Sequence, residues 1–170
     1  MDGRSMTTIQ EVKNMARPLM DAHGLSGWLL EFDNAKNRSG QCWHPQWTAG
    51  RLEPGRISLS RHFVRLNSLE RIRLTLVHEM AHAIVGPGHK HDRVWKAQCL
   101  ALGGDGKARF TEESTVLVTG KFTGVCPTDP KHTYQRHRMT DNMRRRSLYC
   151  RHCMTAGDHE RGRLTWRRNA

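Results

Sequence analysis

The segment His78-Glu79-Met80-Ala81-His82 constrains the fold of this chain more than any other feature. On an α-helix, side chains four positions apart point the same way, so His78 and His82 can bind one metal ion together. Glu79 lies beside that position but is rotated from it, where it can reach a water molecule rather than the ion. The pattern predicts a helix with a catalytic zinc ion, which activates water for attack on a carbonyl, and with Glu79 as the base.

An ordinary helix with two surface histidines is the alternative, because H-E-x-x-H also occurs by chance. Apolar residues recur at helical spacing around the motif, at Leu69, Ile72, Leu76, Met80 and Ala83. They predict a core helix over 69–85, which Gly86-Pro87-Gly88 ends. A core helix does not simply leave its histidines in solvent, so the apolar stripe favours the metal site.

A third ligand is expected nearby, since a catalytic zinc ion usually has three protein ligands and one open position. His89 and His91 both follow the Gly-Pro-Gly turn, which brings the chain back toward the helix. Their position alone leaves both as candidates.

Periodicity and turn residues predict the other elements of the chain. These are a helix from Ile9 that stops by Gly24 and is kinked or ended early by Pro18, strands over 28–32, 41–47 and 56–60, a helix over 92–102, and a strand-like stretch over 114–127. After Gly104 the composition changes to a short, basic part rich in Cys and His. We therefore expect two domains, over 8–118 and 119–170.

The charge of the chain favours a polyanionic partner. The formal net charge is +12, and residues 126–170 contribute +7 of it, with 11 Lys and Arg against 4 Asp and Glu. Nucleic acid, such as single-stranded or damaged DNA, is the first candidate, an anionic membrane is the second, and a merely solvated basic surface is the plain alternative.

The expected compartment follows from two features of the sequence, its apolar runs and its number of cysteines. No apolar run suits a signal peptide or a membrane span, so we expect a soluble cytoplasmic protein, of a bacterium or of a bacteriophage-infected cell, compatible with nucleoid association. Five cysteines are an odd number and argue against a full disulfide framework. We take a monomer as the working assumption, with a protein substrate and no membrane partner.

The C-terminal cysteines predict a second, structural zinc ion. Cys150 and Cys153 form a C-x-x-C pair, which is half of a zinc ribbon, and Cys126 begins the facing segment. The second cysteine of that segment is replaced by Asp129. Three interpretations stay open: Asp129 is itself a ligand, His132 completes a Cys3His site, or the ribbon has lost its metal. A Cys150–Cys153 disulfide is a further alternative.

The basic residues around this site are candidates for phosphate contacts, because the forked donors of arginine suit phosphate. Tyr134, Tyr149 and Trp166 are candidates for stacking on unpaired bases, as in single-strand binders. Packing within the small domain explains these aromatic residues equally well, and solvation explains the arginines. The tentative phosphate-binding set is Arg136, Arg138, Arg144, Arg145, Arg146 and Arg151.

The stretch HEMAHAIVGPGHKHDRVWK, residues 78–96, resembles the zinc-binding core of SprT-like (Spartan-related) metalloprotease domains. In those domains the third ligand is a His just before a short helix with an aromatic residue four positions later. His91 and Trp95 have that spacing. The resemblance therefore favours His91 as the third ligand and leaves His89 without a role.

The segment upstream is similar to the same family. Its strand-pair pattern F-x-x-A-x-x-R-x-G-x-C…I-x-L-S corresponds to Phe32, Ala35, Arg38, Gly40, Cys42, Ile57, Leu59 and Ser60. On this resemblance Cys42 is a buried strand residue, neither nucleophile nor ligand. The resemblance implies an α+β, zincin-like metallopeptidase core of helices on a short three-stranded sheet, followed here by a small zinc-ribbon-like β module.

Three functions are compatible with these residues. The first is a zinc endopeptidase of SprT-like type, since members of that family are linked to proteolysis of proteins trapped covalently on DNA. The second is a non-catalytic zinc protein that binds DNA. The third is a metallopeptidase that cleaves one dedicated partner, such as a repressor.

Overall fold

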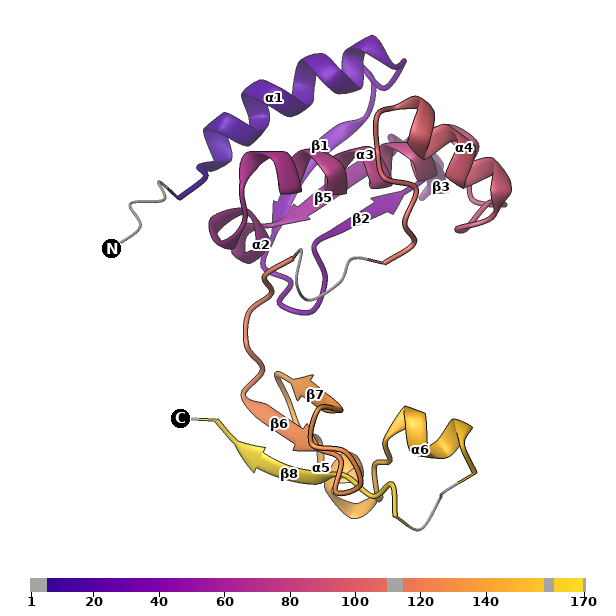
Figure 1. Ribbon diagram of the computed structural model, residues 1–170. Coiled ribbons are helices and arrows are strands. Elements are labelled where there is room, and N and C mark those ends of the chain that lie inside the picture. Colours follow the sequence, from indigo (N-terminus) through magenta and orange to yellow (C-terminus); the bar gives the residue numbers. More distant parts are fainter. Residues whose placement is uncertain (1–5, 110–114, 158–160, 170) are drawn as a thin grey trace. The chain divides into compact units, whose positions relative to one another are not determined.

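The computed structural model describes residues 6–109, 115–157 and 161–169 (Figure 1). The chain divides into two compact units, Met1–Val118 and Thr119–Ala170. Together they contain helices and small separate sheets, so the α+β class predicted from the sequence is confirmed. Within the described residues, no helix has the length and apolar character needed to cross a membrane.

The N-terminal unit contains four helices and five strands among its described residues. In chain order they are α1 (Ile9–Ala22), β1 (Leu29–Asp33), β2 (Gly40–Trp43), β3 (Gln46–Thr48), β4 (Arg51–Glu53), β5 (Arg56–Ser60), α2 (Arg61–Leu66), α3 (Leu69–Val85) and α4 (Arg93–Ala101). Strand β5 is the centre of a three-stranded sheet, parallel to β1 and antiparallel to β2. Strand β2 is therefore an edge strand.

Helix α3 is the central helix of this unit and packs against α1, α4, β2 and β5 (Figure 1). Its boundaries are those predicted from the apolar stripe. The Ser68 hydroxyl caps the first turn by accepting the backbone N–H of Arg71. Gly86 ends the helix with φ at 86°, a conformation that favours glycine. Leu76, Met80 and the neighbouring apolar residues are fully buried, so the motif lies on a core helix.

Helix α1 does not end early at Pro18, so that part of the expectation was wrong. The helix continues to Ala22, with Thr8 and Glu11 forming a capping box at its start. Pro18 removes one backbone N–H, whose partner would have been the carbonyl of Asn14 one turn earlier. Both residues lie on the exposed side, where water can replace the lost bond. The buried side of the helix, with Val12, Ala16 and Met20, keeps its packing.

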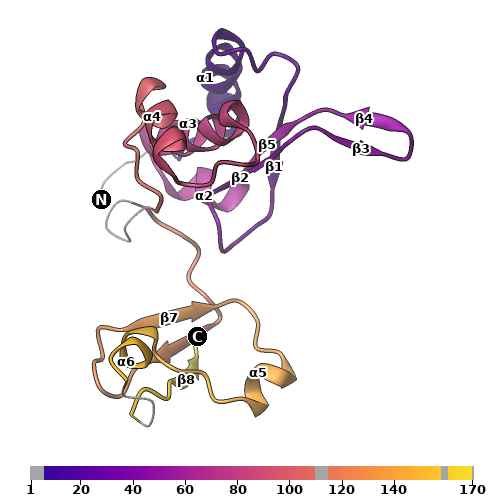
Figure 2. The same cartoon turned by 90° about the vertical axis from the view of Figure 1, so that its right-hand side faces the viewer.

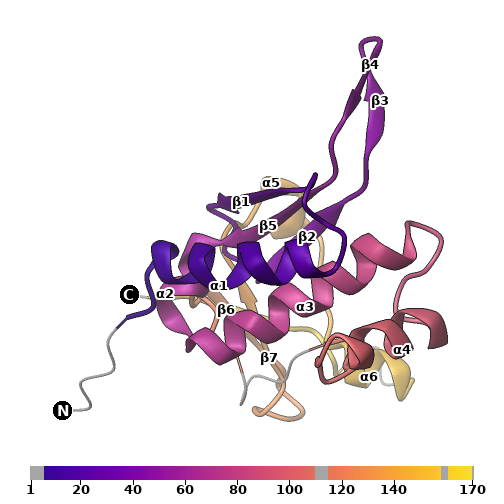
Figure 3. The same cartoon turned by 90° about the horizontal axis from the view of Figure 1, so that it is seen from above.

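The second strand was expected over 41–47 as an irregular strand limited by Pro45, and the chain does break at His44-Pro45, where it divides into β2 and β3. Strands β3 and β4 form a separate hairpin, which extends away from the rest of the N-terminal unit (Figures 2 and 3). Its cross-strand partners Trp47 and Leu52 are 75% and 56% exposed, so no core drives this pairing. Exposed apolar residues of this kind do not follow the alternating apolar and polar pattern from which strands are predicted.

The C-terminal unit is built on a second three-stranded antiparallel sheet. Strand β6 (Phe122–Val125) lies between β7 (Thr133–Arg136) and β8 (Thr165–Arg168), with the short helices α5 (Asp141–Arg145) and α6 (Arg151–Thr155) in the intervening segments. Only β6 forms within the stretch 114–127 expected to be strand-like, and Ser114 lies outside the described residues. Helices α2, α5 and α6 were not predicted; each spans fewer than two turns.

Candidate metal and catalytic site

Two metal-ligating histidines come from one face of α3, and a third reaches them from the turn before α4. The Nε2 atom of His91 lies 3.1 Å from Nε2 of His78 and 3.2 Å from Nε2 of His82. The turn is fixed by Asp92, which caps α4 by accepting the backbone N–H of Trp95. The three imidazoles that the sequence singled out thus converge on one point.

This arrangement fits a tetrahedral zinc ion. With Zn–N bonds of 2.0–2.1 Å, tetrahedral geometry separates ligand nitrogens by about 3.3–3.4 Å. The His91 nitrogen is within 0.3 Å of that spacing to both partners. Among the residues that the structure describes, the group consists of three donors, which is the number of protein ligands usual for a catalytic zinc ion.

Burial and mutual repulsion keep these imidazoles neutral, the state in which they bind metal. Burial, followed by the neighbouring His82 and His91, lowers the pKa of His78 to about 4. Burial likewise lowers the pKa of His82 and of His91. Hydrogen bonds of His78 to the backbone of Lys107 and of His82 to the backbone of His89 oppose these shifts. Such outer bonds orient metal-binding imidazoles.

Trp95 packs against all three histidines of the cluster. Its ring centroid lies 4.7, 5.3 and 4.6 Å from those of His78, His82 and His91. Its indole N–H donates to the backbone carbonyl of His78 at 3.4 Å, and the side chain is 1% exposed. The aromatic residue four positions after His91 therefore has a packing role at the site.

Glu79 lies beside the cluster and is buried, with 8% exposure. Burial raises the pKa of its carboxyl group to about 7, although the positive charge of Arg38 and the backbone N–H of Cys42 oppose the shift. Arg38 is itself held by Asp33, to which it donates a 2.8 Å hydrogen bond, and Ser58 donates to the same carboxylate. Residues from β1, β2, β5 and the β1–β2 loop therefore fix the surroundings of Glu79.

Gly40 on β2 makes room for Glu79. A Cβ atom at this position would lie 3.0 Å from Glu79 Cγ, 3.1 Å from its Oε1 and 3.2 Å from Thr75 Cγ2. The sequence gives no local sign of this contact, because it joins residues far apart in the chain. It explains why a glycine stands in the edge strand opposite the helix.

The Gly40→Ala substitution is expected to lower the free energy of unfolding of the N-terminal unit by about 1–3 kcal/mol, since it overpacks a tight contact. Gly27→Ala is the matched control, because a Cβ there meets no atom within 4 Å and the backbone does not require glycine. Urea unfolding followed by tryptophan fluorescence measures both. Equal stabilities of the two variants would contradict the contact.

A cleft of about 460 Å³ opens beside the histidines and Glu79. Residues 40–42 of the edge strand β2 line one side, and Pro87, His89 and Lys90 line another. His44 also lines the cleft, and sequence reasoning missed it. His89 does not join the cluster but pairs with Asp92, with 2.7 Å between Nδ1 and Oδ2. Cys42 is half-buried on β2, and burial raises the pKa of its thiol to about 12.

The C-terminal unit brings a second group of metal-ligating atoms together. Cys126, His132 and Cys150 each offer one donor, with all donors within 4.8 Å of one another. Cys153 joins through a 3.5 Å contact between its Sγ and that of Cys126. The Cys150 Sγ lies 3.7 Å from His132 Nδ1. With Zn–S near 2.3 Å, tetrahedral geometry expects about 3.8 Å between sulfurs and about 3.6 Å between sulfur and nitrogen, so these donors are compatible with zinc.

The structure distinguishes the two proposed fourth donors. His132 presents Nδ1 to Cys150, whereas Asp129 lies 3.6 Å from Nε2 on the other side of the ring. Asp129 also accepts the backbone N–H groups of Lys131 and His132, with its carboxylate and its carbonyl. Its position suits holding the imidazole rather than binding the metal. All five cysteines are free thiols.

Tyr134 belongs to this cluster. Its hydroxyl donates to Cys150 Sγ at 3.2 Å and accepts the backbone N–H of Arg151 at 2.8 Å. This favours packing over base stacking for Tyr134, which the sequence had left open. Tyr149 is 41% exposed, and Trp166 is half-buried on β8. The six candidate arginines, Arg136, Arg138, Arg144, Arg145, Arg146 and Arg151, are all exposed.

Fold and site together define an α+β protein in which the two histidines of an HExxH helix and a third histidine could hold one metal ion. The SprT-like family matches residues 20–115, more than half of the chain, and the chain belongs to that family. The match includes the three-stranded sheet of β1, β5 and β2, and helices α3 and α4, but not the C-terminal unit. A comparison with curated proteins finds no match.

Proposed function

We propose that the protein is a zinc-dependent endopeptidase with a zincin-like core that acts on DNA-associated or DNA-crosslinked proteins. The observation that carries the proposal is that the Nε2 atoms of His78 and His82 both lie within 3.2 Å of His91 Nε2, with buried Glu79 beside them. A bound zinc ion would supply Lewis-acid activation of water and of the scissile carbonyl.

Glu79 moves the proton in this proposal. A carboxyl group whose pKa is raised to about 7 by burial is suited to accept a proton near neutral pH and to donate it again. The cleft places the carboxylate beside the histidines, where the attacking water must lie. Glu79 would therefore take a proton from that water and pass it to the leaving amine of the cleaved bond.

The edge strand β2 would hold the substrate. Its residues Gly40, Gln41 and Cys42 line the cleft, and the strand pairs only with β5 among the described residues. An extended peptide can add to such an edge by main-chain hydrogen bonds, which tolerate many side chains. This suits an endopeptidase that needs a locally unfolded or extended substrate segment.

The C-terminal unit would bring the enzyme to nucleic acid. Its exposed arginines give it most of the net charge of the chain, and the Cys/His group would bind a structural zinc ion in a ribbon-like module. Proteins bound to DNA would then meet the cleft more often than free proteins.

The test is cleavage of a labelled basic protein with and without single-stranded DNA and a zinc chelator. We expect cleavage that DNA stimulates, that the chelator abolishes and that added zinc restores. Cleavage unaffected by the chelator would overturn the zinc peptidase. Zinc-dependent cleavage without stimulation by DNA would favour a dedicated protein partner, and DNA binding without any cleavage would favour a non-catalytic protein.

A further inference from the structure

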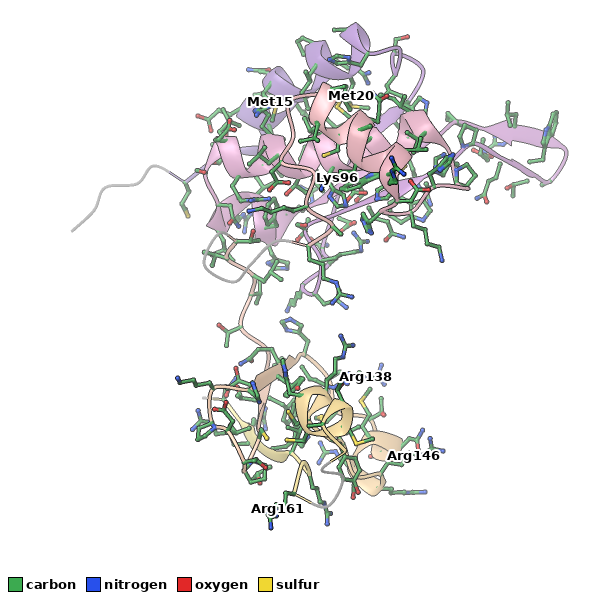
Figure 4. The ribbon with its side chains drawn as sticks, turned by 45° about the vertical axis from the view of Figure 1, so that its right-hand side comes forward. Met15, Met20, Lys96, Arg138, Arg146 and Arg161 are labelled. Atoms are coloured by element: carbon green, nitrogen blue, oxygen red, sulfur yellow. The ribbon has the colours of Figure 1, made fainter. Side chains whose placement is uncertain are left out.

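The β3–β4 hairpin, residues 46–53, stands outside the core of the N-terminal unit. Its strands extend away from the ends of β2 and β5 (Figure 2), and they carry side chains on both sides (Figure 4). Trp47 and Leu52 face each other across the two strands and are 75% and 56% exposed. The hairpin therefore presents an apolar surface with a large aromatic ring, which is available for burial by a partner.

The hairpin continues the register of the three-stranded sheet. Strand β2 pairs with β5 as far as Trp43 and Arg56, and β3 pairs with β4 from Gln46 and Glu53 onward. Two residues intervene on each strand, so neither strand has an extra residue at the break. Each intervening pair contains a proline, which lacks the N–H group needed for pairing. The outer edges of β2 and β3 are therefore two parts of one long edge.

This long edge begins in the cleft. Residues 40–42 of β2 line the cleft, and His44, which also lines it, lies at the base of the hairpin. Pro45 restricts His44 to an extended backbone conformation, so the chain leaves the cleft in the direction of the hairpin. An extended segment that pairs with β2 beside the histidines is thus directed along β3.

The hairpin has a defined turn although its paired side chains are exposed. The backbone φ is 49° at Ala49 and 79° at Gly50, and positive angles at both central residues are typical of turns that match the twist of paired strands. A short loop could join β2 to β5 in the same register, so residues 45–54 are not needed to close the sheet. A preformed hairpin of this kind suits binding, because little conformational entropy is lost when a partner adds to it.

The charge of the hairpin favours a polypeptide partner over nucleic acid. Residues 46–53 contain one cationic and one anionic side chain, Arg51 and Glu53, and these two form an ion pair. The hairpin is therefore neutral in a chain with a net charge of +12. Phosphates are bound by cations that are not already paired. A tryptophan beside a leucine on one face instead matches the apolar side chains of a neighbouring extended segment.

We propose that the hairpin is a second substrate-binding surface, which holds an extended segment of the same protein substrate that occupies the cleft. The segment pairs with β3 through its main chain, and its side chains at every second position pack on Trp47 and Leu52. The substrate class that this surface selects is a locally unfolded polypeptide with alternating apolar residues, long enough to reach past the cleft. The inference rests on the proposed peptidase function and deepens its substrate recognition.

Binding is measured on the full chain carrying Glu79→Gln, so that no cleavage takes place. The probe is a labelled peptide of about 12 residues with apolar residues at alternate positions, which is enough to follow β2 and β3 at about 3.3 Å per residue. We expect fluorescence anisotropy to show that Trp47→Ser weakens binding at least about tenfold, as for an aromatic anchor. Leu100→Ser is the matched control, because Leu100 is 51% exposed on α4 and lies outside the cleft and the hairpin. It should change the affinity by less than about twofold.

Two further measurements test the same surface. A shortened chain, in which Asn-Gly replaces residues 45–54, should unfold at about the temperature of the wild type and lose as much peptide affinity as Trp47→Ser. In the chain with Glu79 intact, Trp47→Ser should raise KM for an unfolded protein and leave kcat unchanged, since the contact is the same in the ground state and the transition state.

Equal peptide affinities of Trp47→Ser and Leu100→Ser, or a lower kcat at unchanged KM, would overturn the hairpin surface and leave the peptidase intact. An equally large loss of oligonucleotide affinity in Trp47→Ser would assign the hairpin to nucleic acid instead. Self-association of the wild type that Trp47→Ser abolishes in sedimentation would assign it to a second copy, and both results would overturn the proposal. A wild type that binds the peptide through Trp47 but cleaves no protein would support the surface and overturn the peptidase.

Discussion

Replacement of Glu79 by glutamine is expected to lower peptidase activity at least about 10²-fold, the lower end of the range for loss of a general base. Glutamine keeps the shape of the side chain but cannot accept the proton. His78, His82 and His91 remain in place, so zinc content should not change. Activity is measured by cleavage of a labelled basic protein on DNA, and zinc is measured by elemental analysis of the purified protein.

Glu70→Gln is the control for this substitution. Glu70 lies on the same helix, is exposed, and forms an ion pair with Arg73. Its loss removes the same charge without touching the cleft, so activity should stay within a factor of two or so of the wild type. If Glu79→Gln cleaved as fast as the wild type with full zinc content, Glu79 would not be the base and the proposed mechanism would fall.

The Glu79→Gln substitution should also stabilise the zinc-free protein at alkaline pH. The native pKa of Glu79 is raised from 4.5 to about 7, so the native state holds this proton more tightly than the unfolded state. The contribution of this carboxyl group to the free energy of unfolding is at its maximum below pH 4.5 and is lost as pH rises to about 7. Above that pH, Glu79→Gln should unfold at a higher temperature than the wild type. The lowered pKa of His78 acts in the opposite direction in both proteins and cancels in the comparison.

The sequence predicts helix α3 well because its signals are local. The apolar stripe, the Ser68 cap and Gly86 all lie within or next to α3, and its boundaries follow from them. The approach of His91 to the helix depends on only a short turn and the Asp92 cap. The three histidines are therefore close to one another in the chain as well as in space.

The surroundings of Glu79 could not be predicted from the sequence in the same way. Its contact with Gly40 and the influence of Arg38 require β2 to lie against α3, and β2 is placed there by pairing with β5. The family resemblance indicated the strand pair, but the packing of β2 against α3 depends on the whole unit, and no local pattern in residues 38–44 indicates it. His44 was missed for this reason, since its place in the cleft follows from the end of β2.

In the C-terminal unit the sequence indicated the ligands but not the architecture. Spacing of the cysteines was enough to group Cys126, Cys150 and Cys153, because few arrangements bring such residues together except around a metal. The short helices α5 and α6 have too few residues for a periodic signal. A cavity of about 300 Å³ in this unit, with Phe122, Leu148 and Trp166 in its lining, is formed by segments far apart in the chain, so it was visible only in three dimensions.

The Cys150→Ser, Cys153→Ser double substitution is expected to reduce bound zinc from two ions per chain to one and to unfold the C-terminal unit. The buried apolar cluster of that unit consists of Cys126, Cys150, Cys153 and Leu164, with few other side chains against it. So small a core contributes little, whereas structural zinc binding contributes about 10–16 kcal/mol in small zinc peptides. That is as large as the whole stability of a typical domain, roughly 5–15 kcal/mol.

Cys42→Ser is the matched control, since it removes a thiol from the N-terminal unit outside both ligand groups and should keep two zinc ions. Elemental analysis gives the zinc content, and limited proteolysis reports whether residues 119–170 are digested while the N-terminal unit survives. A double variant that kept two zinc ions and a protease-resistant C-terminal unit would show that packing alone holds this unit and that its cysteines bind no metal.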